Sequence, residues 1–225
     1  MKGSTTVEPF ILPKSLCPFG RFFDMLKLTK MNHKIIIIPG LGNNVALTSW
    51  AVGNWKNYDL EPVVYSMNWH HPTETFQTKL NKLTNLVDQF KHKSCAVSLI
   101  GCSAGASAAL NAFLERKSSV NKAISLCGRL KTGSQTGSRS LKTRSKSSPT
   151  FADSVSFFEN REDMLTKEDK KRIMTVRSTL DELVPADTAT LTNVTNITIP
   201  VIEHSLSIYL ALKIFNRPLI DFLKS

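Results

Sequence analysis

The chain has 225 residues, of which 41% are apolar and 21% charged, and these ordinary proportions exclude a fibrous or wholly disordered protein. Its length suits one α/β domain with a sizeable core. The formal net charge of +11 favours anionic partners in general, but total charge by itself predicts only non-specific association.

Residues 1–30 lie before the first strong strand pattern. Pro9, Pro13 and Pro18 interrupt the apolar residues of this segment, which therefore lacks the continuous apolar run of a signal peptide. Because Met31 directly precedes the first predicted strand, we expect residues 1–30 to be an arm or an extension from a misassigned start. No run in the chain approaches the roughly 18 apolar residues of a membrane-spanning helix.

Short apolar runs and amphipathic segments alternate over the next hundred residues. The predicted strands are residues 33–39, 61–67, 94–100 and 122–127. The predicted helices between them are residues 46–56, 73–90 and 103–116. Right-handed crossovers would assemble such an alternation into a parallel sheet covered on both faces, so we predict an α/β three-layer sandwich.

A polar and basic segment then interrupts the alternation. Residues 129–146 contain no acidic residue and six basic ones, namely Arg129, Lys131, Arg139, Lys142, Arg144 and Lys146. This segment is too polar for the core, and loops of this length are usually functional or disordered. It could be a solvated loop, a mobile lid, or a patch with weak affinity for anionic surfaces. Short helices are predicted at residues 154–160 and 165–171.

Regular structure returns after residue 171. Strands are predicted at residues 172–177 and 196–202, and Pro200 indicates an edge or irregular position for the second of them. Helices are predicted at residues 206–215 and 218–223. The chain therefore offers six strands for one sheet.

The pentapeptide Gly101-Cys102-Ser103-Ala104-Gly105 joins a predicted strand to a predicted helix. In that context G-x-S-x-G is typical of a nucleophile elbow, in which the serine takes a strained conformation on a sharp turn. Bulk two residues before or after the serine would collide with the turn, which explains both glycines. Ser103 is the predicted nucleophile, and Cys102 should point into the sheet as a buried thiol.

Three further features follow the ends of predicted strands. Gly40-Leu41-Gly42 follows the first strand, Asp181 the fifth and His204 the sixth. Together with the elbow, this order resembles that of the α/β-hydrolase family, over residues 33 to about 222. The resemblance implies a domain at residues 31–225 with a small cap at residues 129–171. It also implies a mostly parallel sheet of about six strands that lacks the family's first antiparallel strands.

The resemblance also implies the chemistry. Ser103 would attack a carbonyl group, His204 would take its proton, and Asp181 would orient the imidazole. The backbone N–H groups of Leu41 and Ala104 would form the oxyanion hole, with Gly40 and Gly42 permitting close approach. The implied activity is hydrolysis of a small-molecule carboxylic ester through an acyl-enzyme, without metal or organic cofactor. Pro39 stands where family members often have histidine.

Several residues near these positions have competing interpretations. Glu182 and Asp187 are also close to the end of the fifth strand, but Asp181 matches the family's D-x-x-V-P pattern. Asp187 is better explained as a first-turn residue of the helix that Pro185 begins. His70 and His71 follow the second strand and could line a pocket, although a surface loop is the simpler interpretation.

Other functions remain open at this stage. The same three side chains would serve a lipase, a thioesterase or a peptidase, and a non-catalytic binding protein could use the same scaffold. A nucleic-acid-binding module is suggested by charge alone and lacks a recognisable motif, so no specific nucleic acid is expected. Cys95, Cys102 and Cys127 fall in or beside apolar runs, and no C-x-x-C pair or metal-binding cluster is present. This usage is typical of a reducing cytoplasm.

Overall fold

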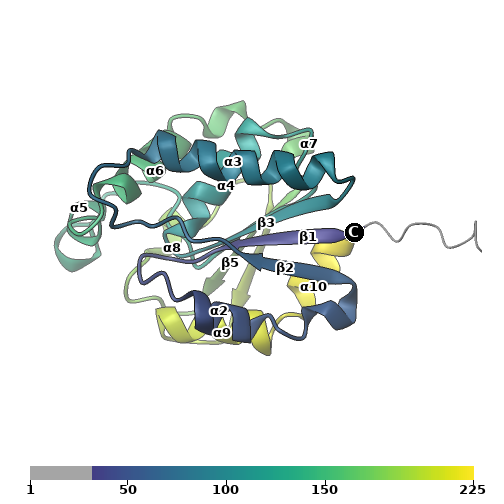
Figure 1. Ribbon diagram of the computed structural model, residues 1–225. Coiled ribbons are helices and arrows are strands. Elements are labelled where there is room, and N and C mark those ends of the chain that lie inside the picture. Colours follow the sequence, from purple (N-terminus) through teal and green to yellow (C-terminus); the bar gives the residue numbers. More distant parts are fainter. Residues whose placement is uncertain (1–31) are drawn as a thin grey trace, which may run out of the picture. The chain divides into compact units, whose positions relative to one another are not determined.

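Six strands form a single parallel sheet in the computed structural model, which describes residues 32–225 (Figure 1). The arm or extension predicted at residues 1–30 lies outside the described residues. The strands are β1 (His33–Ile38), β2 (Leu60–Val64), β3 (Ala96–Cys102), β4 (Ala123–Leu126), β5 (Ile173–Ser178) and β6 (Thr195–Ile199). Their order is β2-β1-β3-β4-β5-β6, and every neighbouring pair is parallel, which confirms the predicted sheet.

Helices cover both faces of the sheet. Figure 1 shows α3 (Phe76–His92), α4 (Gly105–Glu115) and α6 (Pro149–Glu159) on one face, and α2 (Val45–Ala51), α9 (His204–Lys213) and α10 (Arg217–Lys224) on the other. The short helices are α5 (Leu141–Arg144), α7 (Lys167–Lys170) and α8 (Ala186–Ala189), with 3-10 turns at η1 (Trp55–Tyr58), η2 (Gly137–Arg139) and η3 (Glu162–Met164). The three-layer sandwich is confirmed. None of the described helices is long and apolar enough to cross a bilayer.

The isoleucine run of β1 connects the two layers of the core. Side chains alternate between the faces of a strand, and a strand covered on both sides is therefore apolar throughout. Ile36 and Ile38 pack with residues of α3, α4 and α6, whereas Ile35 and Ile37 pack with residues of α2, α9 and α10. All four are fully buried.

The second half of the predicted cap belongs to the helical layer. Phe151, Val155 and Phe158 lie on one face of α6 and are buried in the same core cluster as α4. The Asn111 side-chain amide donates to the Ser154 carbonyl oxygen at 2.9 Å and joins the two helices. The α6 part of the predicted cap therefore packs as a helix of the sandwich.

The expectation that residues 129–146 are too polar for the core is wrong for Arg129, which is 1% exposed. The Arg129 guanidinium donates from Nε to the Lys131 carbonyl oxygen at 3.3 Å and from Nη1 to the Arg139 carbonyl oxygen at 2.8 Å. Leu141 is buried as well. The chain folds back on this arginine, and its own carbonyl groups replace part of the lost water.

Asp169 ties α7 to the neighbouring loops. Its carboxylate accepts hydrogen bonds from Lys117 Nζ at 2.7 Å and from Arg172 Nη2 at 2.8 Å, and it forms a capping box with Thr166. Burial opposes ionisation, but the hydrogen bonds from Lys117, Thr166 and Arg172 prevail and hold the pKa of Asp169 far below its usual range. The folded state therefore stabilises the carboxylate form.

Replacing Asp169 by asparagine is expected to lower the free energy of unfolding at pH 7 by about 2–3 kcal/mol. Because the folded pKa lies below the unfolded one, this stabilisation is present above about pH 4 and is lost as the pH falls further. Urea unfolding of both proteins at pH 7 and pH 3 measures it. The control is Glu168→Gln, whose ion pair with Lys171 is largely exposed and should change stability by less than about 0.5 kcal/mol. An equal loss in both variants would contradict the prediction.

Candidate active site

The candidate site lies where the order of the strands changes direction. The chain leaves β1 for β2 on one side and reaches β3 on the other side, with Ile38 of β1 opposite Gly101 of β3. Open α/β sheets bind ligands in the crevice outside the carboxyl ends of such strands. The Gly40 loop and Ser103 follow these two ends directly.

Ser103 occupies a strained turn between β3 and α4. Its φ of 53° is in the left-handed region that residues with a side chain rarely adopt, and its N–H donates to the Leu126 carbonyl oxygen at 2.9 Å. A Cβ on Gly101 would lie 2.2 Å from the Gly105 carbonyl oxygen, and one on Gly105 would lie 2.1 Å from the Ile38 carbonyl oxygen. The two glycines therefore permit the tight contacts that the turn requires.

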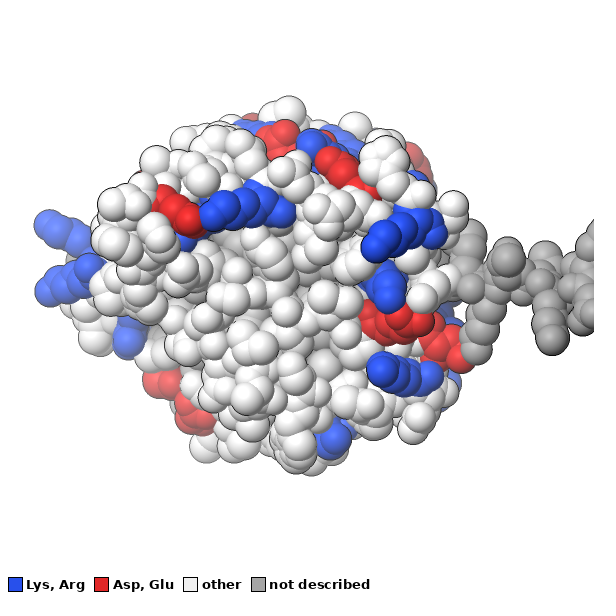
Figure 2. Space-filling view, in the orientation of Figure 1, with Lys and Arg blue, Asp and Glu red and all other residues white. Residues whose placement is uncertain are grey.

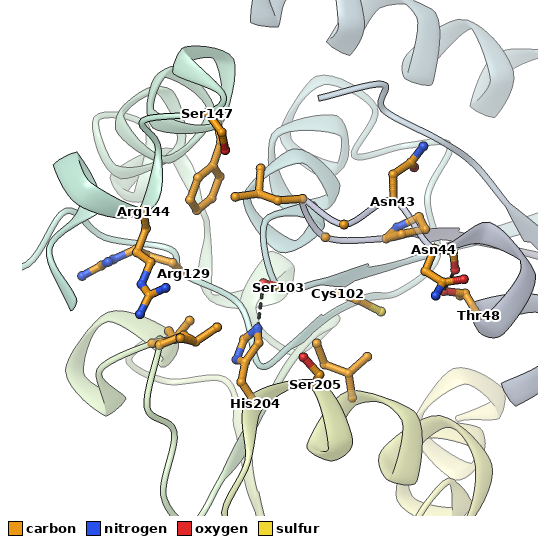
Figure 3. Close-up of a pocket in the computed structure, with 18 of the residues that line it drawn as sticks. Asn43, Asn44, Thr48, Cys102, Ser103, Arg129, Arg144, Ser147, His204 and Ser205 are labelled. Atoms are coloured by element: carbon orange, nitrogen blue, oxygen red, sulfur yellow. Dashed lines mark hydrogen bonds between the residues drawn. The ribbon is translucent and has the colours of Figure 1, made fainter. Parts of the chain in front are cut away.

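Ser103, His204 and Asp181 come together although they are far apart in the sequence. His204 is the first residue of α9, and its Nε2 lies 2.8 Å from Ser103 Oγ (Figure 3). Its Nδ1 lies 2.7 Å from Asp181 Oδ2. His204 is 3% exposed and Asp181 9% exposed, so water screens their interaction weakly. The three predicted side chains form one continuous line of hydrogen bonds.

Asp181 is held as a carboxylate by its surroundings. Its Oδ1 accepts hydrogen bonds from the N–H groups of Leu183 and Val184, each at 2.8 Å. Burial raises the pKa of Asp181, but the His204 imidazole and these two N–H groups outweigh burial and leave the pKa below its ordinary value. Arg139 Nη2 also donates to the Asp181 carbonyl oxygen at 3.0 Å, which fixes the backbone of the turn.

The three carboxylates that follow β5 have different contacts. Only Asp181 contacts the imidazole ring, while Asp187 is exposed in the first turn of α8. Glu182 accepts a hydrogen bond from the backbone N–H of His204 at 3.0 Å. This contact of Glu182 was not predicted, and no sequence pattern indicates it.

The loop after β1 approaches Ser103 closely. A Cβ on Gly40 would lie 2.8 Å from Ser103 Cβ, so a side chain at that position would press on the serine. At Gly42 a Cβ would meet no protein atom within 4 Å, so the close approach to Ser103 depends on Gly40. Within residues 32–225, the N–H groups of Leu41 and Ala104 donate to no other protein group.

Trp69 and His70 brace this loop. The Trp69 indole N–H donates to the Pro39 carbonyl oxygen at 3.2 Å. His70 is exposed, with Nε2 3.0 Å from the Leu41 carbonyl oxygen and Nδ1 2.8 Å from the Ser147 carbonyl oxygen. The ring of His70 therefore joins the loop after β1 to Ser147, directly after the basic segment, a role that the sequence did not reveal. His71 contacts its neighbours Thr73 and Glu74 instead.

A pocket of about 560 Å³ opens at Ser103. Figure 3 shows Arg129, Arg144 and Ser147 on one side of the Ser103–His204 hydrogen bond, and Asn43, Asn44 and Thr48 on the other. The pocket is further lined by Leu41, Thr143, Lys146, Phe151, Leu183, Val184, Ile208 and Tyr209. Neither His70 nor His71 is among its lining residues. A molecule bound there would extend to both sides of the serine.

Cys102 and Cys127 are free thiols inside the core, as is Cys95. Burial raises the pKa of Cys102 to about 12, which leaves very little reactive thiolate at neutral pH. The predicted buried thiol at Cys102 is confirmed. Within residues 32–225, no group of histidine, cysteine, aspartate or glutamate side chains is arranged to hold a metal ion.

No family model and no curated protein matches the chain, but many solved structures do. Est1E from Butyrivibrio proteoclasticus is similar with a TM-score of 0.65 at 17% identity, over 87% of this chain and 88% of that one. A structure from the metagenome-derived lipolytic enzymes LipS and LipT gives 0.61 at 10% identity, over 86% and 94%. The thioesterase domain from the curacin biosynthetic pathway gives 0.56 at 12% identity, over 88% and 92%. The protein therefore has the α/β-hydrolase fold, as the resemblance implied.

Proposed function

We propose that the protein is a serine hydrolase that cleaves a carboxylic ester through an acyl-enzyme intermediate. The observation that carries the proposal is the line of hydrogen bonds from Ser103 through His204 to Asp181 at the mouth of a pocket. A serine hydroxyl is a weak nucleophile until an adjacent base accepts its proton. The esterases and lipolytic enzymes among the structures of similar fold favour an ester as the substrate.

In the first half-reaction, Ser103 Oγ bonds to the carbonyl carbon of the ester while its proton passes to His204 Nε2. The Asp181 carboxylate holds the ring by Nδ1 and stabilises the imidazolium that forms. The N–H groups of Leu41 and Ala104, which have no other partner within residues 32–225, would donate to the developing oxyanion. The carbon–oxygen bond to the alcohol then breaks, and His204 protonates the departing oxygen.

In the second half-reaction, water takes the place of the serine hydroxyl. His204 accepts a proton from the water as its oxygen bonds to the acyl carbon, and it returns a proton to Ser103 Oγ as the acyl–serine bond breaks. The products are a carboxylic acid and an alcohol, and the enzyme regains its starting state. The protein's own groups perform every step of this cycle.

A fluorophosphonate probe tests the proposal, because it forms a covalent bond only with an activated serine. Ser103 Oγ would bond to phosphorus as fluoride leaves, so the wild-type protein is expected to gain the mass of one probe less hydrogen fluoride, on the peptide that contains Ser103. His204→Ala should abolish the labelling, because the hydroxyl then lacks its base. Absence of labelling in the folded wild-type protein, where a known serine esterase reacts under the same conditions, would overturn the proposal.

Replacing Asp181 by asparagine is expected to lower kcat for a p-nitrophenyl ester by about 10⁴-fold at neutral pH. The asparagine keeps the shape of the side chain but removes the charge that stabilises the imidazolium, and its amide can present a donor to Nδ1. Steady-state kinetics measure the effect. Asp187→Asn, the same change at an exposed position of α8, is the matched control, and equal losses in the two variants would reject the assignment of Asp181.

A further inference from the structure

Cations gather on one side of the pocket, and no carboxylate lines it. Arg129, Arg144 and Lys146 are the charged residues of the lining. In Figure 3 the two labelled arginines lie together, across the Ser103–His204 hydrogen bond from Asn43 and Asn44. The pocket thus has a basic side and a neutral side, with the nucleophile between them.

Arg129 is almost completely buried. Its Nη2 is enclosed and has no hydrogen-bond partner, and no ion pair joins the side chain to any carboxylate among residues 32–225. Burial lowers the pKa of Arg129. The charge of Asp187 opposes this effect, and the charges of Arg139 and Arg144 add to it. A buried cation among other cations is unfavourable unless an anion approaches it.

Arg144 is half-buried on the pocket wall. Its guanidinium forms no hydrogen bond or ion pair within the part of the chain that the structure describes, and its Nε is enclosed without an acceptor. A guanidinium offers a planar fork of donors that matches the oxygens of a carboxylate or phosphate. Arg144 therefore presents unused donors at the wall of the pocket.

Three other arginines of the domain are paired with carboxylates. Arg116, Arg161 and Arg172 each form an ion pair with a carboxylate, at 3.0, 2.7 and 2.8 Å respectively. Figure 2 shows basic side chains projecting at the left edge of the molecule, where Figure 1 places α5, while the middle of the same face carries few charges. Arg129 and Arg144 in the pocket wall differ from these three arginines, because neither forms an ion pair with a carboxylate among residues 32–225.

We infer that the ester hydrolysed at Ser103 carries an anionic group, a carboxylate or a phosphate, which binds on the Arg129–Arg144 side of the pocket. This inference rests on the proposed function and specifies its substrate class. Arg144 would contact the anion directly. The largely buried charge of Arg129 in the pocket wall and the exposed Lys146 would add electrostatic attraction. The rest of the substrate would extend toward Asn43 and Asn44.

Hydrolysis of esters that differ only in charge tests the inference. Monomethyl adipate carries its carboxylate on the acyl part, 6-acetoxyhexanoate carries it on the alcohol part, and each is compared with its uncharged primary amide. We expect one of the two acids to exceed its amide in kcat/KM by roughly 10- to 100-fold, as a charged hydrogen bond would provide. The phosphonate analogue of that acid shows whether a phosphate serves better than a carboxylate.

The variant Arg144→Gln is expected to reduce this ratio about tenfold, and Lys142→Gln is the matched control. Lys142 lies on the same short helix, is exposed and does not line the pocket. High salt should also reduce the ratio. Equal ratios for acid and amide in the wild-type protein, or equal effects of the two variants, would overturn the inference.

Binding to Ser103→Ala separates this inference from the proposed function, because this variant should not turn the ester over. Calorimetry is expected to show tighter binding of the same acid than of its amide, and loss of the difference when Arg144→Gln is added. If fluorophosphonate labelling fails while this charge-dependent binding persists, the hydrolase proposal falls and the anion site stands. If labelling succeeds while acid and amide bind equally, the anion site falls alone.

Discussion

Replacing Ser103 by alanine is expected to lower kcat for hydrolysis of p-nitrophenyl butyrate by about 10⁴-fold or more. In the proposed mechanism His204 activates this hydroxyl, which lies 2.8 Å from its Nε2. No other hydroxyl contacts that nitrogen among the described residues. Release of p-nitrophenol under saturating substrate measures kcat. A burst of p-nitrophenol in the wild-type protein, absent from the variant, would report the acyl-enzyme directly.

The matched control is Ser49→Ala, the same substitution at an exposed position of α2. It should leave kcat within about twofold, because surface changes away from a site rarely have large effects. If Ser103→Ala kept more than a tenth of the wild-type kcat, the nucleophile would have to be another group. Cys102 is the adjacent thiol, but its burial and raised pKa argue against it.

Replacing Gly105 by alanine is expected to destabilise the fold by more than about 4 kcal/mol. The new Cβ would lie 2.1 Å from the carbonyl oxygen and 2.8 Å from the carbonyl carbon of Ile38, and both atoms belong to the backbone of β1. Relief would require α4 to move away from the sheet on which it packs, which would open the core. Urea unfolding followed by tryptophan fluorescence measures the loss.

Gly42→Ala is the control for this prediction. A Cβ at Gly42 meets no atom within 4 Å, so the variant should unfold within about 1 kcal/mol of the wild-type protein. The contrast separates a steric requirement from the general effect of removing a glycine. Similar stability of the two variants would show that α4 can shift on β1 without loss.

The strands could be predicted because each depends on a local pattern. The run at residues 33–39 identifies β1, since a strand covered on both faces must be apolar throughout. The end of β3 could not be predicted in this way. The strand continues to Cys102 because Gly101 and Cys102 pair with Ser125 and Leu126 of β4, a partner twenty-four residues further along the chain. Pairing over that distance leaves no mark on the local sequence.

The candidate site also has features that local sequence patterns predict and features that they do not. Ser103, Asp181 and His204 follow a recurring order of residues after strand ends, and the structure brings them together. The contact from His70 to the Ser147 carbonyl oxygen joins residues that are 77 positions apart, in loops with no fixed spacing. The burial of Arg129 was also missed, because composition describes a segment as a whole and does not identify which of its cations the fold encloses.

Two buried thiols near Ser103, Cys102 and Cys127, make local opening of the sheet measurable. Cys102 ends β3 and Cys127 follows β4, and burial raises the pKa of both thiols. A thiol-reactive reagent can modify them rapidly only when this part of the sheet opens. Peptide mass spectrometry would give the rate of modification at each cysteine. These rates would measure how often the carboxyl ends of β3 and β4 separate, beside Ser103. Comparing these rates with and without a bound inhibitor would show how much a ligand at Ser103 suppresses this opening.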